Sequence, residues 1–198
     1  NNLSIAAIIM FVAFIMVFVS GMNGKETIAL MGAGGVLGAM GIFSSDYRRE
    51  RFMSFTNPWK YANDEGYQLV HSLYAIGTGG LFGVGLGNSK QKALYMPEPH
   101  NDFIFAIICE ELGLIGAIII ISVFLVLIVA GINVAMRAKD KYGRLLATGI
   151  ISVIAVQVVI NIAVVTGSMP VTGVPLPFIS YGGTSLVFNL AAIGVLLN

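Results

Sequence analysis

Long apolar runs alternate with short polar connections along this chain, and the lengths of the runs predict helices that cross a membrane. Six candidate spans result: Leu3 to Ser20, Ile28 to Phe43, Gln68 to Gly83, Phe103 to Ala135, Leu145 to Thr166 and Tyr181 to Leu197. The first run lacks a basic leader and a small-residue cleavage site, so we expect a spanning helix there instead of a signal peptide. The pattern predicts an all-α polytopic bundle, with residues 1–198 forming a single membrane domain.

Composition agrees with this pattern and narrows the chemistry. The chain is 57% hydrophobic and 11% charged, whereas soluble proteins carry about 25% charged residues. Its one cysteine, Cys109, excludes an internal disulfide. No P-loop, GxGxxG, HExxH or CxxC pattern is present, which argues against nucleotide, zinc or redox chemistry. Because the sequence ends directly after an apolar run, we expect it to be a fragment.

The distribution of lysine and arginine predicts an orientation. The loop from Ser44 to Tyr67 and the loop from Met136 to Arg144 together hold eight of the eleven basic residues. With six spans these two loops lie on one side, which we therefore expect to be cytoplasmic. The polar stretch that ends at Asp102 and the loop from Gly167 to Ser180 are then extracytoplasmic.

The third candidate span is weak as a membrane helix. It contains His71 and several glycines, and it is barely long enough to cross. Broken segments are tolerated at membrane depth where protein or a water-filled cavity surrounds them. A short or re-entrant element that lines a cavity fits this pattern, and so does close helix packing through small residues.

A polar stretch followed by an apolar run, from Gly85 to Gly116, holds the candidate chemistry. Asp102 falls at the start of the fourth run, where an acid is favoured by the helix dipole and can act as a cap. The alternative is a general base: an ionised carboxylate at a lipid–water boundary, ready to take a proton from a substrate hydroxyl.

Glu110 and Glu111 follow eight and nine residues later, or about 12–14 Å further along a helix. Adjacent residues on a helix point about 100° apart, so these two acids do not form a close dyad. Acids inside a membrane helix are costly and need partners. We expect either hydrogen bonding to a neighbouring helix or a position in the wall of a cavity.

Other polar residues of this stretch have two interpretations each. Lys90 and Lys92 are either interface lysines whose amines reach water or contacts for a phosphate or pyrophosphate group. His100 is a candidate metal ligand or proton shuttle, although no second ligand stands near it, and we predict no metal site. Asn101 and Glu98 are open to the same structural and functional interpretations.

The last polar segment, PVTGVPLPFISYGGTS, combines three prolines with glycines. Such a composition fixes the chain first and then loosens it. We expect a rigid lid or plug, in which Thr172, Ser180 and Tyr181 have cavity-lining or structural roles.

Four long motifs resemble the SEDS family of shape, elongation, division and sporulation proteins (FtsW, RodA and SpoVE). They are GLGNSKQKALYMPEPHNDFIFAIICEELGLIG, NPW at Asn57–Trp59, GYQLVHSLYAIGTGGLFG and VTGVPLPFISYGGTSL. The resemblance covers essentially the whole chain, which looks like the C-terminal half of a ten-span fold. The glutamine-proline-acid-glycine motif expected upstream has no counterpart here. The division and sporulation branch looks closer than the rod-elongation branch.

This resemblance implies a peptidoglycan glycosyltransferase of the bacterial cytoplasmic membrane that polymerises lipid II. It implies Asp102 as the base that deprotonates the acceptor 4-hydroxyl, and inversion at the donor sugar as undecaprenyl pyrophosphate leaves. Lys92, in the family's Gln-Lys pair with Gln91, would contact the pyrophosphate, while Glu98 and His100 would shape the pocket.

The implied partner is a class B penicillin-binding protein, and a nucleic acid is not expected. No cofactor is implied with certainty, and a divalent cation stays open. Two other functions remain as alternatives. The first is a lipid II flippase, and the second is a non-catalytic scaffold that recruits the transpeptidase.

Overall fold

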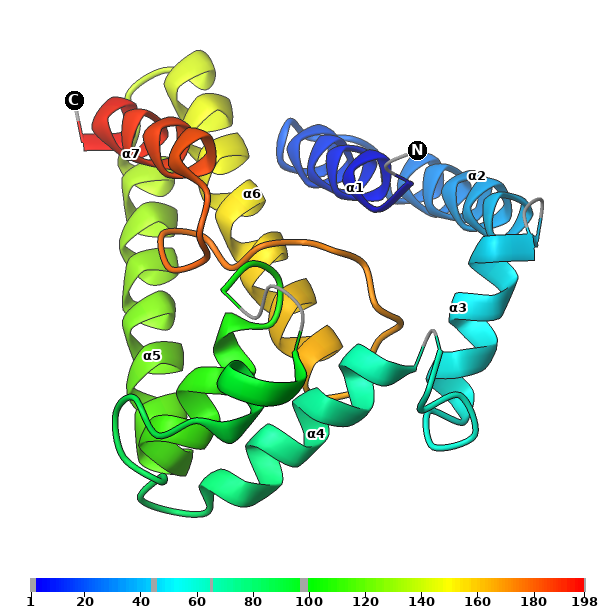
Figure 1. Ribbon diagram of the computed structural model, residues 1–198. Helices are drawn as coiled ribbons and strands as arrows, with labels where there is room; N and C mark the ends of the chain where they lie inside the picture. Colours follow the sequence, from blue (N-terminus) through cyan, green and yellow to red (C-terminus); the bar gives the residue numbers. More distant parts are fainter. Residues whose placement is uncertain (1–2, 44–45, 65, 97–99, 198) are drawn as a thin grey trace.

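The protein is described here by a computed structural model that covers residues 3–43, 46–64, 66–96 and 100–197. Those residues form helices and connecting loops without a strand, which confirms the all-α class (Figure 1). In chain order the elements are α1 (Leu3–Val19), α2 (Gly24–Phe43), α3 (Asp46–Thr56), α4 (Tyr67–Gly79), the short π-helix η1 (Gln91–Tyr95), α5 (Ile104–Arg137), α6 (Lys141–Val165) and α7 (Gly183–Leu197).

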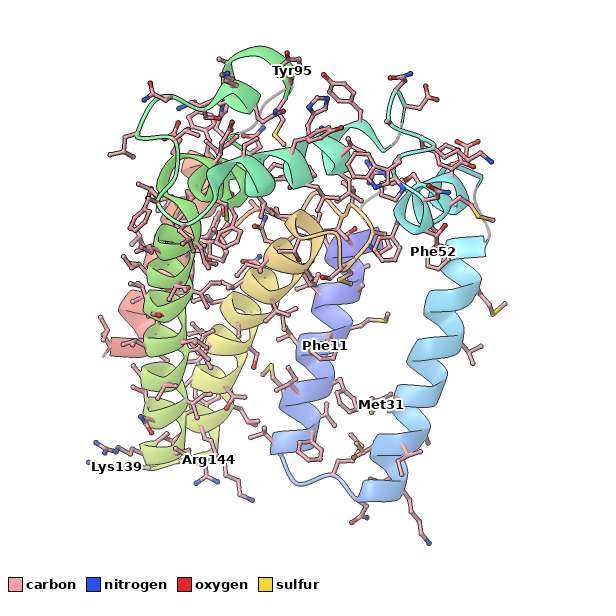
Figure 2. The ribbon with its side chains drawn as sticks, turned by 90° about the horizontal axis from the view of Figure 1, so that it is seen from below. Phe11, Met31, Phe52, Tyr95, Lys139 and Arg144 are labelled. Atoms are coloured by element: carbon pink, nitrogen blue, oxygen red, sulfur yellow. The ribbon has the colours of Figure 1, made fainter. Side chains whose placement is uncertain are left out.

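The helices α1, α2, α5 and α6 run side by side (Figure 2). One end of this bundle carries Lys139 and Arg144 at the turn between α5 and α6, and we call it the turn end. The opposite end carries Phe52 of α3 and Tyr95 of η1, and α4 lies across it. We call it the α4 end.

The core lies between α5 and α6. Phe124 of α5 is buried together with Ile154 and Val158 of α6. The outer surface of α5 exposes large apolar side chains such as Ile118 and Val126. Both helices are long and apolar enough to cross a membrane, and α1 and α7 are shorter apolar helices. Long apolar helices that also expose large apolar side chains are typical of an integral membrane protein.

The third candidate span does not cross. Its helix, α4, has 13 residues and is therefore about 20 Å long, whereas a bilayer core is about 30 Å thick. It lies across one end of the bundle and not alongside the bundle helices (Figure 2). The element is short, as expected, and its helix is too short to cross a bilayer core, while its place in the wall of a cavity stays a prediction.

The expected placement of the two basic loops is wrong for the same reason. Because α4 stays at one end, the segment with α3 and the α5–α6 turn lie at opposite ends of the bundle (Figure 2). Arg51 of α3 accordingly donates a hydrogen bond from Nη1 to the Val171 carbonyl in the loop before α7, at 3.3 Å. The count of eight basic residues against three therefore no longer decides the orientation.

The helix α5 is broken at Gly113, whose backbone has a φ of 69° and a ψ of −166°. An unbroken helix of 34 residues would be about 51 Å long, well beyond a bilayer core. Residues 114–137 span about 36 Å, which suits a tilted crossing. The part from Ile104 to Leu112, with both acids, therefore forms a separate short helix at the α4 end.

The loop after α4 satisfies the backbone groups that this break leaves without helical partners. The amides of Leu114 and Ile115 donate to the carbonyls of Gly80 and Leu81, at 2.9 and 3.3 Å. In return, the Val84 amide donates to the Glu110 carbonyl at 2.9 Å and the Gly85 amide to the Glu111 carbonyl at 3.0 Å. Orphaned backbone groups near a membrane need partners of this kind.

The approach of the two backbones requires glycine. A Cβ at Gly83 would collide with the carbonyl of Glu111, and the φ of Gly83 is 77°. A Cβ at Gly113 would likewise collide with the backbone of Leu81 and Gly83. The close packing through small residues that was expected of this segment is therefore confirmed.

Replacing Gly83 by alanine is expected to destabilise the protein by at least about 1–3 kcal/mol, because it combines a collision with a strained backbone. The matched control is Gly77→Ala in α4, where an added Cβ meets nothing within 4 Å. Thermal unfolding of the purified protein in detergent measures both. An equal melting temperature for the two variants would contradict the packing described here.

Candidate functional site

Asp102 lies just before α5, at the α4 end of the bundle. The helix begins at Ile104, and the residue at its N-cap position, Phe103, makes no side-chain capping hydrogen bond. Asp140 shows the difference, since it occupies the N-cap position of α6 and its Oδ2 accepts the Gly143 amide at 3.0 Å. Asp102 therefore lies one residue before the N-cap position, and both of its sequence interpretations, helix cap and general base, stay predictions.

The loop between α6 and α7, residues 166–182, holds the two residues before Asp102. The Tyr181 amide donates to the His100 carbonyl at 2.8 Å. The rings of these two residues pack edge to face, with their centroids 6.0 Å apart. The Ser180 hydroxyl donates to the Asn101 carbonyl at 2.6 Å. Backbone contacts from one loop therefore fix the path of the chain into Asp102.

A tight turn in the same loop places Ser180. Its Oγ accepts the Leu176 amide at 2.7 Å, and its own amide donates back to the Leu176 carbonyl at 3.0 Å. Within the turn, Phe178 has a φ of 64°, a conformation that costs a side-chain-bearing residue free energy. The LPFIS segment is thus a constrained turn, as expected of a rigid lid.

The loop also approaches the Asp102 side chain. A Cβ placed on Gly173 would lie 3.3 Å from Asp102 Oδ2, so the carboxyl group faces the backbone at this glycine. The adjacent Thr172 has a buried hydroxyl with no hydrogen-bond partner among the described residues. A buried polar atom without a partner is uncommon in proteins and often marks a functional site.

The remaining support comes from α6. Asn161 is 1% exposed, and its amide Nδ2 donates to the carbonyls of Asp102 and Val174, each at 2.8 Å. The side chain therefore ties Asp102 to the loop that covers it.

A second cluster lies around Glu110, which is 2% exposed. Its carboxyl group accepts the hydroxyl of Ser89 and, at 3.1 Å, the amide of Lys90. The Ser89 oxygen in turn accepts the Lys92 amide at 3.0 Å. Glu110 thus shapes the loop from which both lysines extend into solvent. Glu111 keeps one buried carboxyl oxygen without a partner among the described residues.

Gln91 is turned toward α4 and not toward an open site. Its Oε1 lies 2.7 Å from His71 Nδ1, and the residue is 9% exposed. The His71 ring stacks on Tyr95 at 5.3 Å, while the Tyr67 hydroxyl donates to the Tyr95 carbonyl at 2.8 Å. These contacts dock η1 on α4, which gives Gln91 a structural role.

An apolar crevice of about 450 Å³ runs between α1 and α6. Ile5, Ile9 and Met16 form one wall, and Val153 lies on the other. Gly173, the residue that faces the Asp102 carboxyl group, also lines the crevice. The crevice therefore adjoins the loop segment that faces Asp102.

The structure brings most of the predicted residues into these two clusters. The first cluster contains His100, Asn101, Asp102, Thr172, Ser180 and Tyr181. The second contains Lys90, Lys92 and Glu110, whereas Gln91 contacts His71 of α4. Glu98 lies outside the described residues. Among the residues described, no three His, Cys, Asp or Glu side chains gather closely enough to hold a metal.

Three contributors were missed by sequence reasoning: Arg51, His71 as a partner of Gln91, and Asn161. A signal existed for Asn161, because an amide inside an apolar helix needs a hydrogen-bond partner. Arg51 lies at the same end as the loop before α7, whereas the six-span pattern predicts it at the opposite end because it counts α4 as a span.

Comparison with known proteins identifies the family. The family model described as "Cell cycle protein" (FtsW, RodA, SpoVE) matches residues 1–198. This chain belongs to that family. Over 186 residues, 93% of this chain and 50% of the relative, it is 52% identical to stage V sporulation protein E of Bacillus subtilis (strain 168). It is also 45% identical to a probable peptidoglycan glycosyltransferase FtsW of Geobacter sulfurreducens. That alignment of 199 residues covers 100% of this chain and 53% of the relative.

Solved structures agree with this assignment. A chain from a peptidoglycan synthase complex that coordinates polymerization and crosslinking superposes with a TM-score of 0.78 at 28% identity, over 96% of this chain and 53% of that one. An aspartate-to-alanine mutant of the Thermus thermophilus rod shape determining protein RodA gives 0.63 at 26% identity, over 100% and 49%. The chain spans about half the length of the curated SpoVE and FtsW relatives it matches.

The contacts of Glu110 predict how the segment over residues 89–92, which carries Lys90 and Lys92, responds to a substitution. Glu110→Gln replaces one acceptor oxygen by an NH₂ group, which leaves the Lys90 amide or the Ser89 hydroxyl poorly paired. Loss of a buried hydrogen bond costs about 1–3 kcal/mol, so amide exchange at Lys90 and Lys92 should accelerate roughly tenfold or more.

The control is Glu111→Gln, since one Glu111 carboxyl oxygen has no partner to lose in the described structure. Hydrogen exchange read by mass spectrometry on a peptide that covers residues 89–92 distinguishes the two variants. Unchanged exchange in Glu110→Gln would show that the loop does not depend on this carboxyl group.

Proposed function

We propose that the intact protein is a peptidoglycan glycosyltransferase that polymerises lipid II, with Asp102 as general base. The observation that carries this proposal is the placement of the Asp102 carboxyl group. It lies half-buried at the end of a membrane bundle and faces a glycine. Asn161 holds the Asp102 carbonyl, and Ser180 holds the carbonyl of the preceding Asn101. The names of the relatives, which include probable peptidoglycan glycosyltransferases, support the same reaction.

In this reaction the Asp102 carboxylate takes the proton of the acceptor sugar's 4-hydroxyl. The freed oxygen forms a bond to the anomeric carbon of the donor sugar, on the face opposite the leaving group. The bond from that carbon to the pyrophosphate oxygen breaks, and undecaprenyl pyrophosphate leaves with the electron pair. A base in position for such a transfer typically contributes about 10²–10⁴-fold in rate.

The second cluster and the crevice suit the other parts of such a substrate. Lys90 and Lys92 supply positive charge for the leaving pyrophosphate, on a loop that Glu110 holds in place. The apolar crevice beside Gly173 offers surroundings that suit a hydrocarbon chain. A substrate-binding role for the His100 and Asn101 side chains belongs to the same proposal, because hydrogen bonds to their backbones hold both residues next to Asp102.

The proposal places the α4 end outside the cytoplasm. Orientation follows the basic residues of short loops, whereas long segments translocate largely regardless of charge. The short turns at the turn end are flanked by Lys25, Arg137, Lys139, Lys141 and Arg144. The loop over residues 166–182, at the α4 end, contains no lysine or arginine. Arg48, Arg49 and Arg51 of α3 lie within eight residues of the end of α2, so the basic residues alone do not decide the orientation, which follows here from the proposed reaction.

A class B penicillin-binding protein is the partner that fits this function, since newly made glycan must be crosslinked. Similarity to a chain from a peptidoglycan synthase complex supports this choice. The alternative of a flippase finds less support, because polar groups would have to continue along the crossing helices. Residues 114–136 of α5 carry no ionisable side chain.

Asp102→Asn should abolish polymerisation while leaving the fold intact. Asparagine keeps the size of the side chain and can still cap a helix, but it cannot take a proton, so we expect a rate loss of at least about a hundredfold. Asp102→Glu should retain little activity, because one added methylene displaces the carboxylate. The assay uses lipid II, the intact protein and its penicillin-binding partner, with glycan length read on a gel.

The control for this experiment is Asp140→Asn. It makes the same substitution at a capping aspartate of the turn end, and should leave polymerisation unchanged. Normal polymerisation by a folded Asp102→Asn variant would refute the role of Asp102 as base. A variant that binds lipid II and the partner but makes no glycan would exclude the flippase and scaffold alternatives as sufficient functions.

Orientation is tested by single cysteines at Lys60, Lys90 and Lys139 in a Cys109→Ser background. An impermeant thiol reagent applied to intact cells should label positions 60 and 90 but not position 139. Labelling of position 139 alone would invert the orientation and move the site to the cytoplasm. Labelling of 90 without 60, both being exposed in the folded protein, would restore α4 as a span.

A further inference from the structure

Asn161 lies four residues before the end of α6 and is almost completely buried. Its side chain has two donor hydrogens on Nδ2, and each is used: one by the Asp102 carbonyl and one by the Val174 carbonyl, both at 2.8 Å. The two acceptors come from segments 72 positions apart in the sequence, as roughly a third of the chain separates residues 102 and 174.

The chemistry of this contact selects an amide. Two carbonyl oxygens require two hydrogens from one small group, which a primary amide supplies and an aspartate or a hydroxyl does not. The reversed amide would place Oδ1 against both carbonyls, so the orientation of the group is determined by its neighbours. In this arrangement Oδ1 is buried without a partner among the described residues.

An unpaired buried oxygen costs free energy, so the two donations must outweigh that loss in the folded protein. What these two hydrogen bonds provide is a fixed position for the groups that accept them. One acceptor is the backbone of Asp102 itself, and the other adjoins Gly173, which faces the Asp102 carboxyl group. Asn161 therefore sets the separation between the proposed base and the loop that covers it.

We infer that Asn161 is a positioning residue for glycosyl transfer, acting through the backbone of Asp102 and through Val174. This inference rests on the proposed function, in which Asp102 is the base. Small errors in the placement of a reacting group cost large factors in rate. Loss of the amide should therefore lower kcat and leave substrate binding nearly unchanged.

The test compares Asn161→Leu and Asn161→Ala in the intact protein with its penicillin-binding partner and lipid II. Leucine matches the shape and removes both donors, while alanine leaves space for water beside the two carbonyls. We expect kcat to fall at least tenfold in each folded variant, with KM changed less than about twofold. The control is Thr148→Val, which removes a buried hydroxyl from the same helix near the turn end and should preserve kcat.

The outcomes separate this inference from the proposed function. Normal activity of Asp102→Asn would refute the base, whatever Asn161 does. An inactive Asp102→Asn together with a folded Asn161 variant of parental kcat would overturn the positioning role alone. A rise in KM with kcat unchanged would also overturn it. If neither Asn161 variant folds where Thr148→Val does, Asn161 is structural and the inference fails.

Discussion

The exchange of hydrogen bonds at the break in α5 determines the layout of the α4 end. A continuous helix through Gly113 would leave the loop after α4 without partners, and a broken helix without that loop would expose backbone groups of its own. Each segment supplies what the other lacks: amides of residues 114 and 115 for the loop, and amides of Val84 and Gly85 for the helix. The short helix before Gly113 is thereby separated from the part of α5 that crosses. The Asp102 cluster lies at its N-terminal end, and the Glu110 cluster lies near its C-terminal end.

In this arrangement each buried polar group holds a different part of the site in place. Glu110 lies on the short helix, where its carboxyl group orders the loop with Lys90 and Lys92. Asp102 lies just before that helix, and the α6–α7 loop and Asn161 fix its backbone. Buried polar groups act here mainly by satisfying backbone, which is expensive to leave unpaired beside a membrane. The carboxyl group that faces a glycine is therefore held in place by contacts to its own main chain.

Much of this was predictable from the sequence, with informative exceptions. Apolar run lengths predicted the helical bundle, and the polar stretch around Asp102 identified the candidate site. Run length alone did not reveal that α4 lies across the bundle, because a glycine-rich segment of sixteen residues is compatible with a crossing or a short element. That single ambiguity misplaced Arg51. The role of Asn161 depends on two carbonyls distant in sequence, and no local pattern encodes such a contact.

The placement of Asp102 relative to a bound acceptor sugar tests the central claim most directly. We suggest determining the structure of the intact protein with its penicillin-binding partner and lipid II, trapped with an inactive donor. The account predicts a carboxyl oxygen of Asp102 within about 2.6–3.2 Å of the acceptor 4-hydroxyl oxygen, with the Asn161 contacts to Asp102 and Val174 retained. An acceptor hydroxyl directed at another side chain, with Asp102 facing away from the sugar, would contradict the account.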